Sequence, residues 1–168
     1  MHGRTTVFEA IALLPANGKC RLAFMQNPLQ CPPSEYGEAR VRNPRFSRAA
    51  GVLAGNAGLL FVSGTASVRG RRIAGGNDAV AQTRATLENM AALMAAELLV
   101  ERHGWPRPVT WADFRQIRVY VKTGAMLAAV KRCCQETFPG VPQLYLQADV
   151  CLPDALVEIE GVAAIRGS

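Results

Sequence analysis

The sequence predicts an α+β domain in which one mixed β-sheet carries two helices packed on one of its faces. Three observations lead to this prediction. Apolar and polar residues alternate along 114–122 and along 144–151, as in half-buried strands. Residues 79–102 carry apolar residues at helical spacing, and 124–138 is predicted as a second helix. The 168 residues show no internal repeat, so we expect a single domain over 1–168.

The first 45 residues are predicted to form an N-terminal lead with a hairpin and a loop. The hairpin would join EAIALLP (9–15) to KCRLAFM (19–25) through a turn at 16–18. The stretch 30–36 contains two adjacent prolines, which remove backbone donors and fix the chain direction. We therefore expect a loop there.

A short apolar strand is predicted at 59–63, followed by a glycine-rich turn region that reaches Gly76. The region lacks the GxxxxGK[ST] pattern, so a phosphate-binding loop is not expected.

The helix predicted over 79–102 has recognisable ends. Asn77 or Asp78 can cap its first turn, and Gly104 follows its last residues. A single apolar stripe along it is expected to pack in the core, formed by Leu87, Met90, Met94 and Leu98.

The strands near the C-terminus each have two distinct faces. Along 114–122 the apolar face has Ile117, Val119 and Val121, and the polar face has Arg118, Tyr120 and Lys122. Along 144–151 one face has Leu144, Leu146, Ala148 and Val150, and the other has Tyr145, Gln147, Asp149 and Cys151. A turn at 153–154 precedes the last predicted strand, 156–165.

The charge and the aromatic content of the chain limit the kinds of partner that it can be expected to bind. The formal charge is +6, and arginines supply most of it. Apart from Arg69, Arg71 and Arg72 these arginines are scattered, and aromatic residues are only 7% of the chain, so nucleic-acid binding is not expected. A small anionic substrate is the alternative partner, since guanidinium groups match carboxylates.

Neither a membrane segment nor a metal site is expected. Apolar runs are short, and Glu9 interrupts the stretch that a leader peptide would need. The five cysteines form no CxxC, and only two histidines occur, which does not fit zinc. We expect reduced thiols, a cytoplasmic location and no cofactor.

Glu158 is the main candidate for chemistry. It lies inside an apolar strand, where partial dehydration raises the pKa of a carboxyl and suits it to general-acid work. Glu160 shares its face. The alternative is that both are solvated outward positions. Cys151 would need a base to act as a nucleophile, and no histidine is placed to supply one.

The order LLFVSGTAS, AQTRATLENMAALM, FRQIRVYVK and DALVEIEGVAAI, over about residues 45–166, resembles the RidA/YjgF family. The resemblance implies a chorismate-mutase-like α+β fold, assembled as a homotrimeric barrel with pockets between subunits. RidA deaminases carry an arginine at the position of Leu144, and its replacement by leucine disfavours deamination of enamines or imines. That activity is the first alternative function.

A narrower resemblance is to the catalytic C-terminal half of the chorismatases. It rests on YGEARVRNPRFSRA, FVSGTAS and YLQADVCLPDALVEIEG. It implies release of pyruvate from chorismate, with Glu158 as the essential acid. The pair Gly64 and Cys151 resembles the subtype that makes 3-hydroxybenzoate.

The same resemblance suggests residues that hold the substrate carboxylates and ring. These candidates are Tyr36, Arg48, Arg118 and Tyr145, and the polar faces of the two strands add Lys122 and Gln147. Chorismatases are about twice as long and usually have arginine at the position of Leu152. A non-catalytic ligand-binding protein on the same fold is therefore the remaining alternative.

Overall fold

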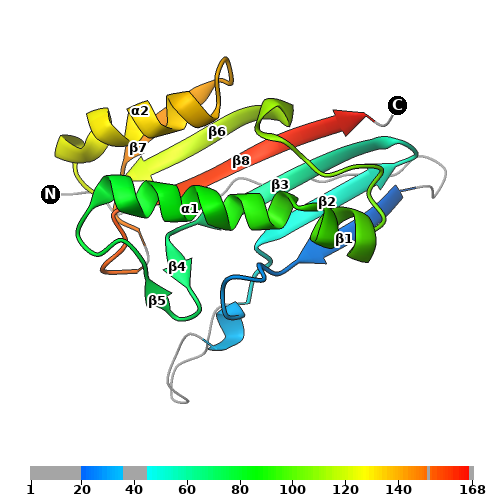
Figure 1. The fold of residues 1–168 in the computed structure, drawn as a ribbon, viewed down its shortest axis with the longest axis horizontal. Helices are drawn as coiled ribbons and strands as arrows, with labels where there is room; N and C mark the ends of the chain where they lie inside the picture. Colours follow the sequence, from blue (N-terminus) through cyan, green and yellow to red (C-terminus); the bar gives the residue numbers. More distant parts are fainter. Residues whose placement is uncertain (1–19, 36–44, 151, 167–168) are drawn as a thin grey trace, which may run out of the picture.

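A computed structural model describes residues 20–35, 45–150 and 152–166. Six strands form one sheet in the order β1-β2-β3-β8-β6-β7, and both α-helices lie across the same face of it (Figure 1). The strands are β1 (Cys20–Met25), β2 (Ala49–Ala54), β3 (Ala57–Thr65), β6 (Phe114–Val121), β7 (Gln143–Gln147) and β8 (Val157–Arg166). The helices are α1 (Ala79–Met94) and α2 (Leu127–Thr137). The predicted α+β class is confirmed.

The sheet is mixed, as predicted. Four neighbouring pairs run antiparallel, and only β6 and β7 run parallel. A parallel pair needs a crossover connection, and α2 supplies it between these two strands. A separate two-stranded ribbon, β4 (Val68–Arg69) with β5 (Arg72–Ile73), follows β3.

The long helix predicted over 79–102 is interrupted, which corrects the prediction. Asp78 does cap it, because its carboxylate accepts from Val80 N–H at 2.8 Å and Ala81 N–H at 3.1 Å. The helix ends at Met94, and 97–102 forms a separate π-helical turn. Leu98 and Leu99 of this turn are both buried in the core.

Two strand predictions also need correction. β2 was not predicted, because AAGVLA lacks the strong alternation of larger residues. Strand β7 ends at Gln147 instead of residue 151, because its partner β6 ends at Val121 and leaves nothing to pair with. Of the predicted N-terminal hairpin, 20–25 is a strand, paired with β2; its first arm lies outside the described residues.

The core lies between the sheet and the helices. Met90, Leu93 and Leu99 pack there with Leu60, Val119 and Ile159, all fully buried. The opposite face of the sheet is uncovered in the described chain. Leu22 and Phe24 on β1 are 65% and 68% exposed, and Leu144 on β7 is 52% exposed. This open face is also where the candidate site lies.

Candidate active site

Glu158 and Gly64 lie directly against each other, on β8 and β3. The register between these strands shifts from Val62 to Thr65, so that β3 bulges where it passes Glu158. A Cβ atom built on Gly64 would lie 2.3 Å from Glu158 Oε1 and 2.8 Å from its Cδ. Only glycine leaves room for the carboxyl in its present position.

The surroundings of Glu158 favour its protonated form. The side chain is half-buried, and burial is the main cause that raises its pKa. The neighbouring Glu160 carboxylate raises this pKa further, whereas Arg48 acts in the opposite direction. A carboxyl with a raised pKa can hold a proton near neutral pH and give it to a substrate.

Arg48 is a buried cation beside this carboxyl. Only 4% of the residue is exposed. Its backbone is fixed between strands: its N–H donates to the Met25 carbonyl at 2.8 Å, and its carbonyl accepts from Ser63 N–H at 3.0 Å. The guanidinium lies 4.9 Å from the centre of the Phe46 ring. The structure thus brings Arg48, Gly64 and Glu158 together.

Glu160 forms a second cluster with two residues of β6. Its Oε1 accepts from Arg118 Nε at 2.8 Å and from the Tyr120 hydroxyl at 2.9 Å. Burial and the Glu160 carboxylate raise the pKa of Tyr120. Arg118 therefore already has a carboxylate partner within the chain. Arg118 was predicted to bind the substrate, and no local sequence pattern indicated its pairing with Glu160.

Lys122 directly follows β6 and contacts the segment that follows β7. Its Nζ donates to the Pro153 carbonyl, and Asp149 lies 3.9 Å from the same nitrogen. Its backbone N–H donates to the Leu156 carbonyl at 2.9 Å. These contacts give Lys122 a role in holding that segment beside the start of β8.

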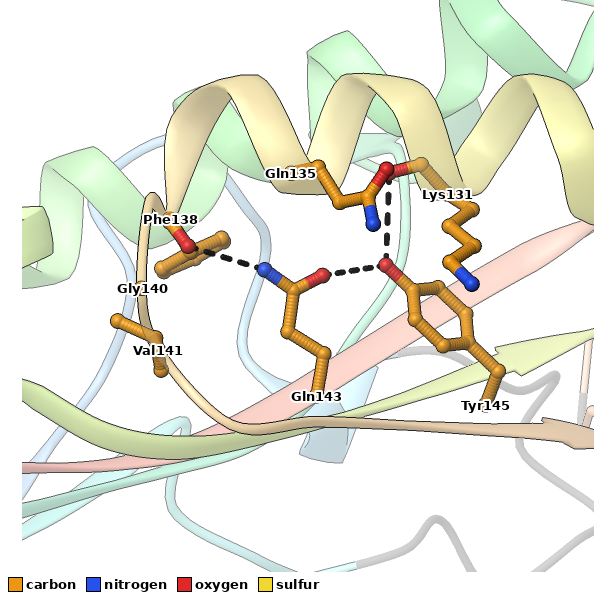
Figure 2. Close-up of a pocket in the computed structure, with 7 residues that line it drawn as sticks. All are labelled: Lys131, Gln135, Phe138, Gly140, Val141, Gln143 and Tyr145. Atoms are coloured by element: carbon orange, nitrogen blue, oxygen red, sulfur yellow. Dashed lines mark hydrogen bonds between the residues drawn. The ribbon is translucent and has the colours of Figure 1, made fainter.

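Tyr145 and Gln147 do not share the surface with Glu158, which corrects their grouping in the sequence analysis. Tyr145 pairs with Val119, whose side chain faces the helices, so both point toward α2. Figure 2 shows the Tyr145 hydroxyl donating to Gln143 Oε1, beneath Lys131 of α2. These residues line a cavity of about 440 Å³ on the helix side of the sheet.

Two buried amides of α1 hold the strands on either side of the site. Gln82 Oε1 accepts from Leu156 N–H at 2.9 Å, just before β8. Asn89 Nδ2 donates to the carbonyls of Ala66 and Val68, both at 2.8 Å, just after β3. Because each amide is fully buried, breaking these bonds is costly. They fix the strand segments that carry Gly64 and Glu158, and the sequence analysis did not single them out.

Comparisons with known proteins agree with this architecture. No family model matches the sequence. A 3-hydroxybenzoate synthase of Streptomyces hygroscopicus is 40% identical over 147 residues, which are 82% of this chain and 42% of that protein. A chorismatase crystal structure matches with a TM-score of 0.80 at 32% identity, covering 85% of this chain and 44% of the other. A YjgF-family structure from Mycobacterium tuberculosis matches with a TM-score of 0.57 at 24% identity, covering 86% of this chain and all of the other.

The chain has the YjgF fold. It is similar in sequence and structure to part of a chorismatase, and it spans less than half the length of the chorismatase relatives named above. The predicted RidA/YjgF fold and the resemblance to chorismatases are confirmed.

Several features of this YjgF-fold chain complete the account of the site. Tyr36 and Cys151 lie outside the described residues. Leu152 packs beside a small apolar cluster of Ala66, Val68 and Ala155. Within 20–35, 45–150 and 152–166, no three His, Cys, Asp or Glu side chains gather as a metal site would need. No helix in the same ranges is both long and apolar enough to cross a membrane.

Proposed function

We propose that this chain releases pyruvate from chorismate and forms 3-hydroxybenzoate, with Glu158 as the general acid. The observation that carries the proposal is the Glu158 carboxyl itself. It is half-buried, lies against Gly64 and has the buried cation Arg48 nearby. The 3-hydroxybenzoate synthase at 40% identity and the chorismatase structure support the choice of substrate.

The reaction needs one general acid that can transfer a proton to a carbon atom of the substrate. Glu158 gives its proton to the methylene carbon of the enol ether, which makes an oxocarbenium-like cation. The ring hydroxyl then bonds to the ring carbon that bears the ether. That carbon–oxygen bond breaks, its electron pair stays with the departing pyruvate oxygen, and the hydroxyl proton returns to Glu158. The resulting arene oxide opens to the phenol. No water is consumed, because the two products together contain the atoms of chorismate.

Arg48 is proposed to bind a substrate carboxylate. Guanidinium groups pair well with carboxylates, and the backbone that carries this one is fixed by hydrogen bonds to Met25 and Ser63. The Arg48 guanidinium favours the ionised form of Glu158. A bound carboxylate offsets that charge, so substrate binding itself helps Glu158 to keep its proton until the transfer.

The activity is tested by incubating the purified chain with chorismate. We expect pyruvate and 3-hydroxybenzoate in equal amounts, followed by lactate dehydrogenase coupling and by chromatography. A dihydroxycyclohexadiene acid in place of the phenol would show capture by water and would contradict the proposed product. If neither product forms, the proposed activity is wrong and the binding-protein alternative takes its place.

The proposed assembly is a homotrimer with pockets between neighbouring copies. The support is the open sheet face, on which Phe24 and Leu144 are largely exposed in a single chain. We expect a trimeric mass in light scattering at micromolar concentration. Phe24→Ser should weaken the assembly, whereas Leu127→Ser on the helix side should not. A monomeric mass for the unaltered chain would contradict the proposal.

A further inference from the structure

Two carboxyls lie two residues apart on the open face of β8, in unlike surroundings. The Glu160 carboxylate is bound by Arg118 Nε at 2.8 Å and by the Tyr120 hydroxyl at 2.9 Å. Within the described residues no hydrogen bond is formed to the Glu158 carboxyl, which instead lies against the bare backbone of Gly64. Hydrogen bonds and a cationic partner stabilise the charged form of a carboxyl.

This difference decides which carboxyl carries a proton. The Glu160 carboxylate is a like charge on the same face of β8, and it raises the pKa of Glu158. Glu160 already has the Arg118 guanidinium and the Tyr120 hydroxyl as its hydrogen-bond donors. Because Arg118 is paired with Glu160, it stabilises the ionised form of Glu158 only weakly. Of the two carboxyls, Glu158 is therefore the one whose surroundings favour the protonated form.

The other groups around Glu158 do not reverse this order. Tyr120 is its direct partner across the β6–β8 pairing, but the Tyr120 hydroxyl donates to Glu160. Lys122, one position further along that face, is held by Pro153 and Asp149. From β3, Gly64 brings no charge. Arg48 is the one described cation that favours ionised Glu158, and burial and Glu160 both act against it.

We propose that Glu160, held as an anion by Arg118 and Tyr120, is a positioning residue that keeps the neighbouring Glu158 carboxyl in its protonated form. This inference rests on the proposed function for its purpose, since a protonated Glu158 is what the general acid requires. Glu160 acts only through Glu158 and need not touch the substrate.

The test is to measure the titration of Glu158 directly, without turnover. Carboxyl carbons of labelled glutamates are followed by NMR across pH, and Glu158→Gln identifies the Glu158 signal. Glu160→Gln keeps an oxygen that can accept from Tyr120 but removes the charge. We expect the Glu158 midpoint to move to lower pH by about one unit. Glu136→Gln, an exposed change on α2, should leave it in place.

The pH dependence of turnover gives a second measurement. Activity needs protonated Glu158, so it is lost as pH rises through the pKa of this group. Lowering that pKa in Glu160→Gln should move this loss to lower pH, with the rate on the acidic side largely kept. The NMR titration needs no substrate, so it can be carried out on an inactive protein. If the protein is inactive but the Glu158 midpoint still shifts in Glu160→Gln, the proposed function is wrong and the role of Glu160 stands. An unmoved or raised Glu158 midpoint in Glu160→Gln would overturn the role of Glu160, whether or not the protein is active.

Discussion

Replacing Glu158 with glutamine is expected to lower kcat for pyruvate release from chorismate by about 10²–10⁴-fold. Glutamine keeps the shape and the hydrogen-bonding reach of the side chain, but it has no proton to give to the methylene carbon. The carboxyl lies on the open face in contact with Gly64, so the change should disturb little of the fold. The rate is measured by coupling pyruvate to lactate dehydrogenase.

Two comparisons make this experiment specific. Thermal unfolding of Glu158→Gln, followed by circular dichroism, should match that of the unaltered chain. Glu136→Gln removes an exposed carboxyl on α2 and should keep the full rate. Turnover like that of the unaltered chain in Glu158→Gln would remove Glu158 from the mechanism.

Gly64→Ala is expected to lower turnover by roughly 10²-fold, since a displacement of about 1 Å at a reacting group has that size of effect. The new Cβ would lie 2.3 Å from Glu158 Oε1, much less than any normal contact. The carboxyl is at the end of a flexible side chain, so it can move aside. The chain should therefore fold, with its acid displaced.

The matched control is Gly124→Ala, in the turn before α2. A Cβ there meets only Gln147 Oε1 at 3.3 Å, and the site is on the other side of the sheet. That variant should keep nearly the full rate. If Gly64→Ala also kept the full rate, the present position of the Glu158 carboxyl would not matter for the reaction.

The product should change along with the rate. A compact Gly64 lets the ring hydroxyl reach the reacting carbon, and such internal attack benefits from proximity. Under the proposed function, the double variant Gly64→Ala with Cys151→Val is expected to crowd the ring, so that water competes and the dihydroxycyclohexadiene acid increases. The two products are separated by chromatography. An unchanged product ratio would remove these positions from the control of product.

Much of the fold could be predicted because its elements carry local signals. The alternation over 114–122 predicts a strand and Asp78 predicts a helix start from neighbouring residues alone, and the structure confirms both. Strand β2 was missed because AAGVLA has no such signal. Its residues become a strand by pairing with β3, which follows after a two-residue turn, and with β1, which is distant in sequence.

The site was harder to predict because alternation does not say which face of a strand is covered. In β7 the larger apolar residues Leu144 and Leu146 are exposed, whereas Tyr145 turns toward α2. The polarity of Tyr145 and Gln147 therefore did not reveal that they lie on the helix side of the sheet. Glu158 and Gly64 were grouped by resemblance alone, and their contact depends on the β3 bulge, which no local pattern revealed.

Proton transfer from Glu158 to the enol-ether carbon is tested most directly by running the reaction in deuterated water. The pyruvate is reduced at once by lactate dehydrogenase, so that later exchange of its methyl protons is avoided, and the lactate is examined by mass spectrometry. We predict one solvent-derived deuterium in the methyl group at early times, at a rate that Glu158→Gln lowers as strongly as turnover. Pyruvate released without that deuterium would contradict protonation of the methylene carbon, and with it the role given to Glu158.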